Sequence, residues 1–173
     1  MNIVINGHSG SGKSTAIRRI LCALQETPYG FWTEKLPFGS NAPVYLHPCR
    51  LPLTYTEENR IGFCRERHAQ AEPAVFESVG VAALSDIPRG ALVLMDEVGV
   101  MERDAAEFQR AVFRILDGDY RVLVAVRDRS TPLLDAIRSH PKSLLADAPE
   151  ANTPDFLAKA LRLFTQTRDA MQE

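Results

Sequence analysis

A glycine-rich stretch near the start of the chain, "GHSGSGKST" at residues 7–15, has the residue types that bind phosphate groups. It fits the spacing G-x-x-x-x-G-K-[ST], with Gly7 and Gly12 as the fixed glycines and Lys13 after them. Glycines let the backbone turn tightly and direct its N–H groups at phosphate oxygens, and a lysine adds positive charge. The motif therefore predicts a nucleoside triphosphate site. The phosphate-binding residues that it predicts are Gly7, His8, Ser9, Gly10, Ser11, Gly12, Lys13, Ser14 and Thr15. Because His8 occupies a variable position of the motif, we expect its side chain to point outward.

Two adjacent acids, Asp96 and Glu97, follow the apolar run "LVLM" at residues 92–95. A phosphate-binding loop of this type needs a carboxylate at the end of a neighbouring strand to hold Mg²⁺, and Asp96 is predicted to do so together with Ser14. A second carboxylate beside the γ-phosphate can orient or deprotonate a water molecule. Glu97 and Lys13 are therefore predicted to be catalytic, which points to hydrolysis. The alternative for Glu97 is a structural glutamate in a salt bridge.

Two arginines follow a predicted strand in the segment "VRDRS". Arg127 and Arg129 lie just past the carboxyl end of that strand, where ligands bind in parallel sheets. An arginine beside the γ-phosphate speeds phosphoryl transfer by about 10³–10⁵-fold where one is present. Both residues are candidates for this role, and surface ion pairing is the alternative for each.

Alternating strands and helices must position these residues. Short apolar or β-branched runs predict strands at residues 2–6, 29–35, 91–95, 120–126 and 142–146. Apolar residues at helical spacing predict helices at residues 14–25, 75–84, 104–118, 131–140 and 153–164. Thr153 is the predicted N-cap of the last helix. This alternation indicates an α/β domain with a mainly parallel sheet, and with the glycine-rich motif it predicts a P-loop NTPase fold.

Residues 36–72 interrupt this alternation. Four prolines fall between residues 36 and 60, with "VYL" at residues 44–46 as a predicted strand among them. We expect a hairpin and loop excursion near the site, outside the core.

Length and composition limit the alternatives. The 173 residues suit one domain spanning residues 1–173, and 45% hydrophobic with 24% charged residues is ordinary for a globular protein. The net charge of −2 argues against nucleic acid as a partner, and no apolar stretch suits a membrane span. Three cysteines without a CxxC pair, and a start without a signal-peptide pattern, predict a cytoplasmic protein with free thiols. Nothing in the sequence indicates a protein partner.

Four segments, "GHSGSGKST", "GFWTEK", "LMDEVGVMERDAAEFQRAV" and "APEAN", resemble the nucleoside-triphosphatase family first described from thermophiles, which includes a cancer-related vertebrate member. The resemblance implies a RecA-like three-layer α/β/α fold with an added hairpin. It also implies slow, Mg²⁺-dependent hydrolysis of ATP, GTP and other nucleoside triphosphates, with broad base specificity, to the diphosphate and phosphate. By position, Thr33 and Glu34 would face the site, and residues 92–99 would lie along the nucleotide. The added hairpin strand after Lys35 matches either residues 44–48 or residues 60–64.

This chain departs from the family pattern at two places. Many relatives have lysine where this chain has Val100, so another group must supply that positive charge if the lysine neutralises phosphate. Relatives tend to have Asn-Arg near the end, whereas Thr153 follows Asn152 here, which weakens any inference about contacts to the base or ribose.

Two other functions use a P-loop and Mg²⁺. A small-molecule or nucleotide kinase would need a lid that excludes water, and residues 36–72 are the candidate segment. A non-catalytic ATP-dependent switch is the other alternative, whereas the absence of an "NKxD" segment argues against a Ras-like GTPase. Glu97 beside Asp96 favours water as the acceptor.

Overall fold

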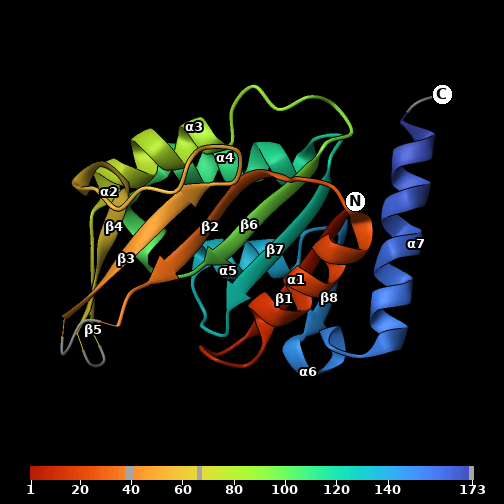
Figure 1. Cartoon of the computed structure of the whole chain (residues 1–173), viewed down its shortest axis with the longest axis horizontal. Helices are drawn as coiled ribbons and strands as arrows, with labels where there is room; N and C mark the ends of the chain where they lie inside the picture. The colour runs from red at the N-terminus through yellow and green to blue at the C-terminus, as the bar shows by residue number, and fades with distance from the viewer. Residues whose placement is uncertain (38–40, 66–67, 172–173) are drawn as a thin grey trace.

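One sheet of eight strands organises the computed structural model, which describes residues 1–37, 41–65 and 68–171 (Figure 1). Its strand order is β5-β4-β3-β2-β6-β7-β1-β8. The strands are β1 (Asn2–Gly7), β2 (Tyr29–Lys35), β3 (Asn41–Pro48), β4 (Arg60–Arg65), β5 (His68–Ala71), β6 (Leu92–Val98), β7 (Arg121–Arg127) and β8 (Ser143–Asp147).

The strands β2, β6, β7, β1 and β8 are all parallel, as the alternation of strands and helices predicts. The segments that follow them therefore meet at one edge of the sheet, the edge at which α/β proteins bind ligands. Gly7, at the end of β1, is in register with Arg127, at the end of β7. Trp32 of β2 is in register with Asp96 of β6. The strand ends thus bring the predicted site residues to the same edge.

Helices cover both faces of the sheet, which gives the three-layer α/β/α arrangement predicted from the resemblance (Figure 1). One face packs against α1 (Lys13–Leu24), α6 (Ala148–Ala151) and α7 (Pro154–Ala170). The other packs against α2 (Pro73–Val75), the π-helical turn Phe76–Gly80, α3 (Val81–Ala83), α4 (Ala106–Asp117) and α5 (Pro132–Arg138). Two 3₁₀ turns, Glu57–Asn59 and Met101–Asp104, complete the helical elements of the described residues.

Phe108 of α4, which is fully buried, packs against two other aromatic rings of the core. Its ring lies 5.5 Å from that of Phe31 in β2 and 5.2 Å from that of Phe76 in the π-helical turn. A Cβ atom on Gly80 would come within 2.7 Å of the Phe108 ring, so a glycine is needed for this close approach. The predicted helix at residues 75–84 is confirmed, although its π-helical turn was not predicted.

The predicted cap of the last helix is also confirmed. The Thr153 side-chain oxygen accepts a hydrogen bond from the Phe156 N–H at 3.2 Å, and α7 begins at Pro154. The helix continues to Ala170, six residues beyond the predicted end at 164.

Three antiparallel strands, β3, β4 and β5, form most of the described part of residues 36–72 and extend the main sheet. Both candidate segments for the hairpin strand are strands, and β3 is the one that pairs with β2. The expectation that this excursion stays outside the core is wrong, because Leu46 and Ile61 are buried in it. Residues 38–40 and 66–67 of the excursion lie outside the described residues.

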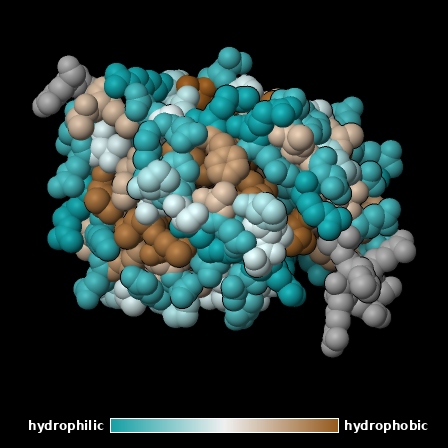
Figure 2. Space-filling model, turned by 180° about the vertical axis from the view of Figure 1, so that it is seen from behind, coloured by the Kyte–Doolittle hydropathy of each residue, from teal (hydrophilic) through white to brown (hydrophobic). Residues whose placement is uncertain are grey.

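The surface is largely hydrophilic where the molecule is seen from behind the view of Figure 1, and apolar side chains form small patches there (Figure 2). Within residues 1–37, 41–65 and 68–171, no helix combines the length and the apolar character needed to cross a membrane.

Candidate functional site

The glycine-rich loop connects β1 to α1, as the motif requires. Gly10 and Gly12 have φ values of 76° and 98°, in the left-handed region that favours glycine. The loop closes on itself through a hydrogen bond from the Ser11 N–H to the His8 carbonyl at 3.2 Å. The His8 side chain is exposed, which confirms the expectation that it points outward. The chain thus forms the strand–loop–helix unit in which backbone N–H groups bind phosphates.

Lys13 lies under this loop and is only 4% exposed. Its Nζ donates hydrogen bonds to the carbonyl oxygens of Gly7 and His8, both at 2.8 Å, and lies 3.8 Å from Oε1 of Glu97. Burial lowers the pKa of Lys13, and the nearby Glu97 carboxylate partly opposes this effect. The loop therefore holds a buried cation against its own backbone carbonyls and beside Glu97.

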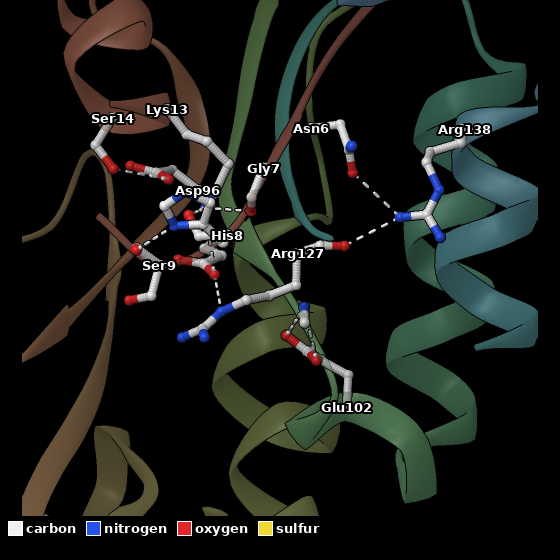
Figure 3. Close-up of polar contacts among 12 residues, drawn as sticks. Asn6, Gly7, His8, Ser9, Lys13, Ser14, Asp96, Glu102, Arg127 and Arg138 are labelled. Atoms are coloured by element: carbon white, nitrogen blue, oxygen red, sulfur yellow. Dashed lines mark hydrogen bonds and ion pairs between the residues drawn. The ribbon is translucent and has the colours of Figure 1, made fainter. Parts of the chain in front are cut away.

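Ser14 and Asp96 form an oxygen pair beside Lys13. The Ser14 hydroxyl donates to Oδ1 of Asp96 at 3.4 Å, and Asp96 is 9% exposed (Figure 3). Burial raises the pKa of Asp96 to about 6, and the hydrogen bond from Ser14 opposes this rise. In the described part of the chain, no three His, Cys, Asp or Glu side chains gather as a metal site. Two protein oxygens suit Mg²⁺, which takes few protein ligands and completes its shell with phosphates and water.

Glu97 lies at a bulge in β6, where the pairing with β7 shifts between Asp96 and Val98. Regular alternation would place Glu97 on the apolar face of the sheet that contains Met95. The bulge puts Val98 into that core cluster instead. Glu97 is thereby left at the edge, where its Oε1 forms ion pairs with Lys13 and Arg127. Bulges of this kind commonly re-aim side chains beside active sites.

Arg127, one of the two predicted arginines, is therefore part of the site, and its side chain is 40% exposed. Arg129 is exposed, and its backbone carbonyl accepts a hydrogen bond from Arg138. Val100, at the position where relatives have lysine, is 44% exposed. Of these positions, only Arg127 places a cation against Glu97.

Glu102 is a site residue to which the sequence assigned no role. It is 2% exposed, and both of its carboxylate oxygens accept from the Gly99 N–H at 3.1 Å (Figure 3). Burial raises the pKa of Glu102 to about 7, and hydrogen bonds from backbone N–H groups oppose this rise. The segment "DEVGVME" contains Glu102, so its presence in a distinctive segment was the available signal.

Replacing Glu102 with glutamine is expected to stabilise the protein more at pH 8 than at pH 5. A carboxyl group with a pKa of about 7 in the folded state, against 4.5 ordinarily, keeps a proton that the unfolded chain releases. Wild-type stability therefore falls as the pH rises from about 4.5 to about 7. Glutamine is uncharged at both pH values, and its oxygen can still accept from Gly99. Urea denaturation should show a gain on the order of 2 kcal/mol larger at pH 8, and an equal effect at both pH values would contradict the assignment.

Asn152, the last residue of the segment "APEAN", also contacts the loop, a contact that the resemblance alone does not predict. Its side-chain nitrogen donates to the carbonyls of Gly12 at 3.1 Å and Ala148 at 2.8 Å, and its own carbonyl accepts from Arg19 at 2.6 Å. A Cβ atom on Gly12 would lie 3.0 Å from this side chain. Asn152 therefore attaches α6 to the phosphate-binding loop.

Thr33 and Glu34 were expected by resemblance to face the site. In the structure, Glu34 accepts a hydrogen bond from the Tyr55 hydroxyl at 2.7 Å and lies 3.7 Å from the His47 ring nitrogen Nε2. Its partners thus come from β3 and the loop after it, and not from the phosphate-binding loop.

Comparison with known proteins adds evidence independent of this geometry. A family model described as NTPase matches residues 2–158. The nucleoside-triphosphatase THEP1 of Thermotoga petrophila is 27% identical, with 93% of this chain and 91% of that protein covered. The cell division ATP-binding protein FtsE of Escherichia coli is 26% identical, with 94% and 68% covered. The crystal structure of THEP1 from the hyperthermophile Aquifex aeolicus matches with a TM-score of 0.71 and 23% identity, covering 95% of this chain and 99% of that chain, which shows the same fold.

Proposed function

We infer the function of this chain from the NTPase family, to which it belongs by the match over residues 2–158. Its activity is the hydrolysis of nucleoside triphosphates, as in the relatives named nucleoside-triphosphatase. We propose further that the reaction depends on Mg²⁺, is slow, accepts several bases, and yields the diphosphate and phosphate. We also propose that residues 1–173 act as one domain and that the protein is cytoplasmic, with which its three free cysteines agree.

The observation that carries this proposal is the position of Glu97. The bulge in β6 places its carboxylate 3.8 Å from the Lys13 ammonium and in contact with the Arg127 guanidinium. A lysine of this motif binds the β- and γ-phosphates, so a water molecule beside Glu97 would lie close to the γ-phosphorus. A carboxylate at this point favours water as the acceptor over a second substrate.

Ser14 and Asp96 are the proposed ligands of Mg²⁺, because their side-chain oxygen atoms lie 3.4 Å apart at the start of α1 and the end of β6. When bound, the ion would neutralise negative charge on the β- and γ-phosphate oxygens. The nine residues from Gly7 to Thr15 are proposed to surround the phosphates, with Lys13 as the principal cation.

Glu97 is proposed to accept a proton from the attacking water. The water oxygen then forms a bond to the γ-phosphorus, and the bond from that phosphorus to the bridging oxygen breaks. The electron pair of the broken bond stays on the terminal oxygen of the diphosphate, where Lys13 can stabilise the charge. The proton on Glu97 passes to solvent and restores the carboxylate.

Phosphate release from ATP, GTP, CTP and UTP tests this proposal. We expect release from all four nucleotides with Mg²⁺ and its loss when EDTA is added, because Ser14 and Asp96 do not replace the ion. Retention of full activity in EDTA would contradict the role of Ser14 and Asp96. Phosphate transfer that requires an added acceptor would identify a kinase instead.

A further inference from the structure

We propose that Arg127 is a catalytic residue that binds the γ-phosphate, and that Arg138 is a positioning residue that holds its backbone. The proposal rests on the proposed NTP hydrolysis, since it assigns the second cation of that site. Without Arg127, Lys13 would be the one cationic side chain of the proposed site that faces the charge of the transferred phosphoryl group.

The position of Arg127 places its side chain beside the phosphates. Its Cα pairs in register with that of Gly7, the first residue of the phosphate-binding loop, and the Asp128 N–H donates to the Gly7 carbonyl at 3.2 Å. The Arg127 guanidinium and the Lys13 ammonium both approach the same oxygen, Oε1 of Glu97. Because Lys13 reaches the γ-phosphate from that position, Arg127 can reach it from the other side.

Small and acidic neighbours fit this role. A Cβ atom on Gly99 would lie 3.3 Å from the Cγ atom of Arg127, so glycine leaves room for the arginine stem. The Glu97 carboxylate attracts the guanidinium to this side of β7. A γ-phosphate carries more negative charge than one carboxylate and offers bidentate acceptors, so it can compete for the guanidinium.

Arg138, at the end of α5, holds the backbone from the opposite side (Figure 3). Its Nη1 donates to the Arg127 carbonyl at 3.0 Å and to Oδ1 of Asn6 at 3.3 Å, and its Nη2 donates to the Arg129 carbonyl at 2.6 Å. Asn6 in turn donates to Asp147 at the end of β8, at 3.0 Å. Arg138 therefore joins the end of β1 to the backbone of Arg127 at the end of β7. This connection limits the positions that the Arg127 side chain can take.

Kinetics and binding of Arg127→Ala, with Arg129→Ala as the matched control, test the catalytic role. We expect Arg127→Ala to lower kcat by about 10³-fold, the lower end of the effect of such arginines. Its affinity for AMP-PNP, a non-hydrolysable ATP analogue, should fall at least about tenfold when measured with Mg²⁺. Its affinity for ADP should stay unchanged. Arg129→Ala should match the wild type, because Arg129 contributes only backbone contacts to this network. Arg127→Lys should recover part of the loss, since it keeps the charge without the bidentate geometry.

Arg138→Met tests the positioning role. It should lower kcat less than Arg127→Ala does, and adding it to Arg127→Ala should cause no further loss, because both changes act on one interaction. Unchanged kcat and an unchanged AMP-PNP to ADP affinity ratio in Arg127→Ala would overturn the catalytic role. Independent losses in the double variant would overturn the positioning role. If the wild type released no phosphate, the proposed function would fail, whereas the AMP-PNP to ADP ratio would still test the γ-phosphate contact.

Discussion

Replacing Glu97 with glutamine is expected to lower kcat for NTP hydrolysis by about 10²–10⁴-fold, the usual contribution of a general base. Glutamine keeps the size of the side chain at the bulge in β6 but cannot accept a proton from water. Nucleotide binding should persist or strengthen, because the substitution removes a negative charge 3.8 Å from the Lys13 ammonium. The loss therefore belongs to kcat and not to KM.

Phosphate release measures kcat, and the single tryptophan gives a separate measurement of binding. Trp32 is in register with Asp96, so its fluorescence should report the arrival of Mg²⁺ and nucleotide. Glu58→Gln is the matched control, because Glu58 is an exposed acid outside this site. Release by Glu97→Gln at the wild-type rate would remove Glu97 from the mechanism.

Replacing Lys13 with methionine is expected to lower kcat/KM by about 10²–10³-fold, comparable to the loss of one transition-state donor. Methionine occupies much of the buried volume of the lysine stem but supplies no charge to the phosphates. The same change should leave the thermal midpoint unchanged or raise it. Burial disfavours the charged form of Lys13 and lowers its pKa, so losing this charge offsets the loss of the hydrogen bonds to the Gly7 and His8 carbonyls.

Parallel measurements of phosphate release and thermal unfolding check both parts of this prediction. Activity lost together with a large fall in the thermal midpoint would mean that Lys13 is chiefly structural. Activity lost at an unchanged or higher midpoint is the result expected for a functional residue that costs stability.

The parallel half of the fold could be predicted because its elements are locally encoded. The continuous apolar runs of β6 and β7 and the helical spacing in α4 each identify an element without reference to the rest of the chain. The antiparallel strands β3 and β4 are harder to predict, because four prolines interrupt the pattern of apolar residues between residues 36 and 60. Their burial depends on packing against the distant residues of the main core cluster, including Phe76 and Phe108.

The residues of the candidate site also differ in how far the sequence alone predicts them. The phosphate-binding loop and the pair Asp96 and Glu97 lie in short continuous segments, so residue types and spacing were enough to propose them. Asn152 and Arg138 meet their partners across 140 and 11 residues of sequence, and only the folded chain brings them together. The choice between Arg127 and Arg129 also depended on the fold, because the ion pair with Glu97 distinguishes them.

Hydrolysis in water enriched in oxygen-18 tests the central claim, attack by water on the γ-phosphorus, most directly. In a single turnover of ATP with Mg²⁺, each phosphate released should carry one oxygen atom from the solvent, and ADP should carry none. Label in ADP would show attack at the β-phosphorus, and phosphate without label would show that another group is the acceptor. Either result would contradict the role proposed for Glu97.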